Sequence, residues 1–184
     1  MLAVTWSPEW CRTRAADPSE RLQCVDNRFG WVLHGLWPNG ERAPHPRYCR
    51  PPTPVPVATI RRHLCMTPSP DLIQHEWAAH GVCGWNDPEA YFAQAAALWN
   101  GLERPDPVAL AGPSGRLTAG ALRTAFADAN PGLPREAVFV GVATGNRLRE
   151  IRICHDLSMK PRSCPADARG TPDGVSMLVE PMRG

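Results

Sequence analysis

Apolar and polar residues alternate in short segments near both ends of the chain, and this pattern predicts β-strands. The segments are rich in β-branched and aromatic residues, as strands are, and cover residues 2–6, 30–34, 137–143, 147–154 and 175–180. Gly145-Asn146 separates the third and fourth of them and is typical of a hairpin turn. The sequence therefore predicts a sheet built from the two ends of the chain.

The middle of the chain has helical periodicity instead, with predicted helices over residues 57–66, 70–80, 88–100 and 119–129. The second of these has the clearest boundaries. Ser69 suits the N-cap, Pro70 the first helical position and Gly81 the C-terminal stop. Early strands, central helices and late strands together predict one α+β domain over residues 1–184, with helices packed on a central antiparallel sheet.

Composition narrows the function classes. With 184 residues, of which 43% are hydrophobic, the chain can form one packed core. No apolar run approaches the roughly 20 residues of a transmembrane helix, so we expect no membrane partner. The net charge of +2 argues against a protein that coats nucleic-acid duplexes but leaves room for an enzyme that holds one or two phosphates.

Seven cysteines are spread along the chain without a CxxC pair, which disfavours zinc ribbons and thioredoxin-like motifs. Scattered cysteines in a small proline-rich domain indicate disulfides, and hence a periplasmic or secreted protein. No segment before residues 2–6 resembles a signal peptide, so we expect that one is absent from this chain. The odd count leaves one thiol unpaired.

Two segments carry candidate chemistry: His34-Gly35-Leu36-Trp37-Pro38-Asn39 and His75-Glu76-Trp77-Ala78-Ala79-His80-Gly81-Val82-Cys83. On a helix, residues 75, 76, 79 and 80 share an arc of about 140°. One face would then present two imidazoles and a carboxylate. The histidines are five residues apart rather than the four of the zincin motif, so we expect no metal site and no cofactor.

Histidines and a carboxylate without a metal suit RNA cleavage. A neutral imidazole takes the proton of the ribose 2′-OH as this oxygen attacks phosphorus, and a protonated imidazole gives a proton to the departing 5′-oxygen. A further imidazolium can stabilise the charge that develops on the phosphate.

The two segments resemble the active-site signatures HGLWP and HEWxKHGxC of the ribonuclease T2 family. Residues 2–11, 46–49 and 121–164 resemble further parts of that family, so the likeness covers most of the chain. It implies a metal-independent endoribonuclease that acts on single-stranded RNA through a 2′,3′-cyclic phosphate, and we expect a monomer.

Position by position, the resemblance implies that His80 is the general base and His34 the general acid. His75 would hold the phosphate and Glu76 would orient the site. Trp37 would stack on a base, although core packing explains a tryptophan there equally well. Asn39 could contact a base edge but is first of all a turn residue.

Residue 79 departs from the signature, because alanine replaces its lysine in the middle of the predicted catalytic face. Loss of one electrostatic stabiliser costs about 10²- to 10³-fold in rate in other enzymes, so we expect a slowed enzyme that Ala79→Lys accelerates. A nearby arginine could substitute for the lysine.

The resemblance also implies the disulfides Cys49–Cys83 and Cys154–Cys164, and it suggests Cys11–Cys24. Cys65 would remain as a buried free thiol. Two functional alternatives stay open: a weakened relative that binds RNA or a protein partner, and a metalloprotein that uses His75, Glu76 and His80.

Overall fold

A computed structural model describes residues 1–168 and 170–182, and its centre is a six-stranded sheet in the order β2-β1-β5-β6-β3, with β4 paired to β5. The strands are β1 Leu2–Trp6, β2 Trp31–Leu36, β3 Arg116–Thr118, β4 Val138–Ala143, β5 Arg147–Ile153 and β6 Ser176–Leu178. Four of the strand pairs are antiparallel, as predicted, and β5 meets β6 in a short parallel contact at Arg147 and Leu178. The α+β prediction is confirmed.

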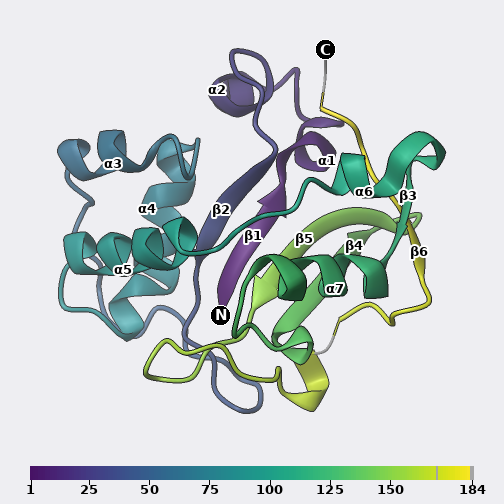
Figure 1. Cartoon of the computed structure of the whole chain (residues 1–184). Coiled ribbons are helices and arrows are strands. Elements are labelled where there is room, and N and C mark those ends of the chain that lie inside the picture. The colour runs from purple at the N-terminus through teal and green to yellow at the C-terminus, as the bar shows by residue number, and fades with distance from the viewer. Residues whose placement is uncertain (169, 183–184) are drawn as a thin grey trace.

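The helices are α1 Ser7–Cys11, α2 Arg21–Cys24, α3 Val57–His63, α4 Pro70–Ala79, α5 Pro88–Asn100, α6 Pro107–Ala111 and α7 Ala119–Ala129. Helices α3, α4 and α5 gather beside β2, whereas α7 lies against β4 on the other side of the molecule (Figure 1). One cluster of buried residues joins both groups to the sheet, with Trp6, Trp77, Tyr91 and Phe126 among its largest members.

The longer elements follow local signals in the sequence. Ser69, Asp87 and Thr118 each accept a hydrogen bond from a backbone N–H in the first turn of the helix that follows, as N-caps do. Gly145 and Asn146 both have positive φ in the turn between β4 and β5. Helices α5 and α7 therefore have the predicted bounds.

Three short α-helices and one short strand were not predicted, namely α1, α2, α6 and β3. None exceeds five residues. Segments of this length hold too few turns or alternations to show a period, and packing stabilises them. Among the described residues, no helix has the length and apolar character that crossing a membrane requires.

The structure contains the three expected disulfides, Cys11–Cys24, Cys49–Cys83 and Cys154–Cys164. Cys65 is unpaired, as expected, but it is exposed, so the prediction that it is buried is wrong. It lies just after the end of α3, outside the helical turns whose apolar face packs inward.

We expect the Cys49–Cys83 disulfide to contribute the most stability. It closes a loop with a sequence separation of 34, against 10 for Cys154–Cys164. Loop-closure entropy then predicts losses of about 4 and about 3 kcal/mol in the free energy of unfolding for the paired serine variants. Urea unfolding measures both values, and an unchanged midpoint in the Cys49→Ser/Cys83→Ser variant would contradict this account.

Candidate active site

The six residues predicted for the site line one cavity of about 500 Å³: His34, Trp37, Asn39, His75, Glu76 and His80. They come from β2, from the loop that follows it and from α4, with His80 directly after the end of that helix. A cavity of this volume lies within the usual range for small-ligand sites. The two signatures, 36 residues apart at Asn39 and His75, thus meet in space.

A β-bulge directs His34 into this cavity. Pairing between β1 and β2 shifts so that Ala3 faces Gly35 while Val4 faces Leu33, which leaves His34 without an opposite residue. Bulges re-aim side chains in this way and often lie beside active sites. The imidazole Nδ1 of His34 then lies 3.5 Å from the hydroxyl of Thr5 on the neighbouring strand.

The outer edge of β2 is fixed to the segment between α3 and α4 and to α5. The N–H of Leu33 donates to the carbonyl of Met66 at 2.8 Å, and the hydroxyl of Thr67 donates to the carbonyl of Leu33 at 3.0 Å. The Tyr91 hydroxyl on α5 bonds both the N–H and the carbonyl of Leu36 at 3.1 Å. These bonds hold the strand that carries His34 against α5 and against the segment that leads into α4.

Glu76 is the buried centre of the site, with 1% of its surface exposed. Its Oε2 accepts a hydrogen bond from the indole N–H of Trp37 at 2.7 Å, and its Oε1 lies 3.4 Å from Nε2 of His34. A buried carboxylate needs such partners. Glu76 therefore joins α4 to His34 and Trp37 of the first signature.

Gly35 makes room for this carboxylate. A Cβ atom on residue 35 would lie 1.9 Å from Oε2 of Glu76, far inside contact distance. A glycine inside a strand often marks such a close approach. Gly35 is therefore a requirement of the site, not only of the strand.

The imidazole of His80 is buried in the wall of the cavity. Burial lowers its pKa from 6.5 to about 4, Glu76 opposes this effect, and the charge of Arg47 reinforces it. Its Nδ1 is buried and has no hydrogen-bond partner among the described residues. At neutral pH His80 is thus uncharged and able to accept a proton.

Trp37 packs among charged and imidazole groups. Its ring centroid lies 5.1 Å from that of His34 and 5.3 Å from that of His80, and the guanidinium carbon of Arg152 lies 4.7 Å from it. These contacts position both imidazoles around one indole. Base stacking by Trp37 stays a prediction.

Asn39 braces the turn that follows Trp37. In the orientation that satisfies its hydrogen bonds, the side-chain nitrogen donates to the carbonyl oxygens of Trp37 at 3.1 Å and Pro38 at 3.3 Å. The turn role is therefore visible, and a base contact stays a prediction.

Ala79 differs from expectation. Its side chain is fully buried and is not part of the cavity lining, so the prediction that it lies in the middle of the catalytic face is corrected. The loop after β2 crosses this point, since the N–H of Tyr48 donates to the carbonyl of Ala79 at 2.9 Å. The arc drawn on an isolated helix could not include this covering loop.

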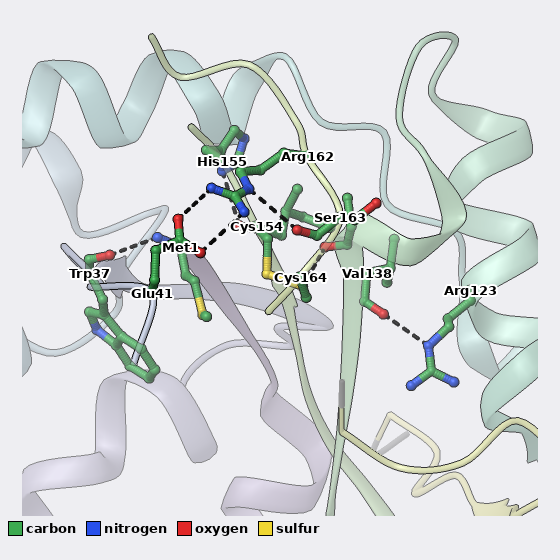
Figure 2. Close-up of a disulfide and its surroundings, with 12 residues drawn as sticks. Met1, Trp37, Glu41, Arg123, Val138, Cys154, His155, Arg162, Ser163 and Cys164 are labelled. Atoms are coloured by element: carbon green, nitrogen blue, oxygen red, sulfur yellow. Dashed lines mark hydrogen bonds and ion pairs between the residues drawn. A yellow bond between two sulfur atoms is a disulfide. The ribbon is translucent and has the colours of Figure 1, made fainter. Parts of the chain in front are cut away.

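The same loop is also held at its outer end. Arg162 bonds the carboxylate of Glu41 at 2.6 Å, beside the Cys154–Cys164 disulfide (Figure 2). A second cavity of about 340 Å³ opens between these segments and shares Trp37 and Asn39 with the first.

Three further lining residues with charged or titratable side chains were missed as site residues, namely His45, Arg47 and Arg152. Arg152 lies on β5 and donates to Glu150 Oε1 at 2.6 Å. Nothing local in the sequence distinguishes these residues from solvated ones, because loop and sheet geometry bring them to the cavity. In the described part of the chain, no three His, Cys, Asp or Glu side chains are arranged to hold a metal ion.

Comparison of the chain with known proteins gives sequence relatives in bacteria and animals. A protein of Haemophilus influenzae described as a probable ribonuclease is 39% identical over 118 residues, covering 58% of this chain and 43% of that protein. A ribonuclease T2 protein of Caenorhabditis elegans is 25% identical and covers 92% of this chain and 68% of its own length. The chain matches less than half the length of the bacterial relatives.

Solved structures share the fold at low sequence identity. A ribonuclease-related protein from Calystegia sepium has a TM-score of 0.75 at 18% identity, with 100% of this chain and 96% of that chain covered. RNase NT in complex with 5′-AMP has a TM-score of 0.72 at 20% identity, with 98% and 97% covered. The family model described as ribonuclease T2 family matches residues 1–164. The chain therefore belongs to the ribonuclease T2 family.

Proposed function

We propose that this protein is an endoribonuclease that cleaves single-stranded RNA by transphosphorylation, without a metal ion or cofactor. The observation that carries the proposal is the pairing of two different imidazoles in one cavity. His80 is buried, with its pKa lowered to about 4, whereas His34 lies 3.4 Å from the Glu76 carboxylate. The uncharged His80 can accept a proton, and Glu76 orients the ring of His34 for proton donation.

The reaction follows from these roles. His80 takes the proton of the ribose 2′-OH, and the 2′-oxygen forms a bond to the adjacent phosphorus. The bond between phosphorus and the 5′-oxygen breaks, and His34 gives its proton to that oxygen. The products are a 2′,3′-cyclic phosphate and a free 5′-hydroxyl, so protons and bonds balance.

The remaining residues bind and orient. His75, which is exposed at the mouth of the cavity, contacts the phosphate. Glu76 orients His34 and Trp37 through its two oxygens. Trp37 and Asn39 lie where two cavities meet and contact the base next to the scissile bond. Residue 79 supplies no cation to this cavity, since the alanine there is buried outside its lining.

We also propose that the enzyme works in an oxidising compartment. Three disulfides favour an oxidising compartment, which fits a periplasmic or secreted enzyme. We expect residues 1–184 to act as a single catalytic domain and as a monomer.

Cleavage of the dinucleotide UpA and of single-stranded homopolymers in EDTA tests the proposal. We expect a 2′,3′-cyclic phosphate product by mass spectrometry and no cleavage of the matched 2′-deoxy substrate, which lacks the attacking hydroxyl. Inactivity toward all RNA substrates, sensitivity to EDTA or cleavage of the 2′-deoxy substrate would each overturn it. Binding of RNA without cleavage would favour the alternative of a weakened, RNA-binding relative.

A further inference from the structure

The proposed reaction needs positive charge near the phosphate, and residue 79 does not provide it. Phosphoryl transfer places negative charge on the non-bridging oxygens, which cations and N–H donors stabilise. Two arginines line the cavity, Arg47 and Arg152. They differ in what they already bind.

Arg152 is held by other groups. Its Nε and one terminal nitrogen donate to Oε1 of Glu150 at 3.1 and 2.6 Å. Its guanidinium carbon also lies 4.7 Å from the ring centroid of Trp37 and 4.6 Å from that of Phe139. The charge of Arg152 is thus partly neutralised and its position is fixed within the wall of the cavity.

The guanidinium of Arg47, unlike that of Arg152, is not paired with a carboxylate of the described residues. Among the described residues it makes no ion pair with a carboxylate, and its closest aromatic contact is the adjacent Tyr48 ring, 5.5 Å from its guanidinium carbon. The side chain is exposed at the mouth of the cavity. It can therefore reach a ligand without breaking an existing ion pair.

The fold fixes the backbone of Arg47 over the end of α4. Cys49, two residues later, is bonded to Cys83, and Tyr48 donates its N–H to the carbonyl of Ala79 at 2.9 Å. Tyr48 adopts a positive φ of 52°, which an ordinary residue keeps only where its surroundings hold it. Residue 47 is thus tied to the helix position where the family signature has its lysine.

The charge of Arg47 also acts on His80, the proposed base. Three neighbouring side chains lower the pKa of His80 through their charge, and Arg47 has a larger effect than His75 or His34. Arg47 also lines the same cavity as His80 and His34, between which the proposed reaction places the phosphate.

We propose that Arg47 is a catalytic residue that binds the non-bridging oxygens of the scissile phosphate and supplies the positive charge absent at Ala79. The inference rests on the proposed ribonuclease function. A guanidinium presents two parallel N–H donors to a phosphate, a geometry that lysine cannot reproduce.

Cleavage of UpA by Arg47→Ala, Arg47→Lys and Arg42→Ala tests this role. We expect a fall in kcat of about 10²-fold for Arg47→Ala and partial recovery for Arg47→Lys. Arg42 belongs to the same loop but lies outside the cavity lining, so Arg42→Ala removes the same charge and should stay within about twofold of the wild type. Equal activities of the Arg47→Ala and Arg42→Ala variants would overturn the inference.

Two readouts separate phosphate binding from a structural effect. Inorganic phosphate should inhibit Arg47→Ala at least about tenfold more weakly than Arg42→Ala, because a charge-assisted contact is lost. The acidic limb of kcat/KM should move to higher pH in Arg47→Ala, because removing a nearby positive charge raises the pKa of His80. An unchanged limb together with unchanged phosphate inhibition would show that Arg47 does not contact the phosphate.

The outcomes also distinguish the two proposals. If the wild type cleaves UpA and Arg47→Ala behaves like Arg42→Ala, only the role of Arg47 is wrong. If the wild type cleaves no RNA, the proposed function is wrong and the role of Arg47 falls with it.

Discussion

Replacement of His80 by alanine should lower kcat on single-stranded RNA by about 10³- to 10⁴-fold. Burial lowers the pKa of His80 to about 4, so its imidazole is uncharged at neutral pH, and its removal takes away the proposed acceptor of the 2′-OH proton. His34→Ala should cause a loss of similar size, because the 5′-oxygen would then leave without its proton.

His63→Ala is the matched control for this experiment. His63 is 7% exposed, as is His80, and each has one buried ring nitrogen without a partner among the described residues. It stacks on Phe92, away from the cavity. Both variants remove a buried imidazole, so thermal unfolding should shift comparably. Activity should fall only for His80→Ala, and equal losses in the two variants would mean that His80 acts through stability alone.

Gly35→Ala should cost about 10²-fold in kcat/KM and about 1–3 kcal/mol in the free energy of unfolding. The added methyl would lie 1.9 Å from Oε2 and 2.6 Å from Cδ of Glu76, so the carboxylate has to move. Movement of Glu76 breaks its hydrogen bond with Trp37 and its pairing with His34. Steady-state kinetics and urea unfolding measure the two losses.

Two comparisons test whether Gly35 acts through Glu76. Gly174→Ala adds a methyl with no atom within 4 Å and should change neither quantity. In a Glu76→Ala background, Gly35→Ala should cause little additional loss of activity, because the obstructed carboxylate is gone. Full additivity of the two losses would contradict the proposed connection.

Much of the fold was predictable because its signals are local. Ser69, Asp87 and Thr118 begin helices through side-chain bonds within one turn, and Gly145-Asn146 forms a turn through its own backbone preferences. Gly81 shows the limit of such reasoning. The sequence predicts a helix stop at Gly81, but packing requires glycine there because a Cβ atom would lie 2.3 Å from the ring of Trp77. This contact depends on tertiary packing.

The residues of the candidate site were likewise predictable only where the signal is local in the sequence. His34, His75, Glu76 and His80 were predictable because each lies in a short signature. Gly35 carried the weak signal of a glycine inside a strand, whereas the Tyr91 bonds to Leu36 span 55 positions. Arg47 reaches the cavity only because a disulfide and a backbone bond fold its loop over Ala79, and no local pattern encodes this.

The pH dependence of kcat/KM for UpA, measured from pH 3 to 9 in EDTA, tests the central claim most directly. Protonation of His80 in the free enzyme removes the base, so the rate constant should rise tenfold per pH unit at low pH and level off near the His80 pKa of about 4. The limb should be absent from the residual activity of His80→Ala. An acidic limb that persists in His80→Ala, or one in the wild type centred near the ordinary histidine pKa of about 6.5, would contradict the assignment of a buried neutral His80 as the base.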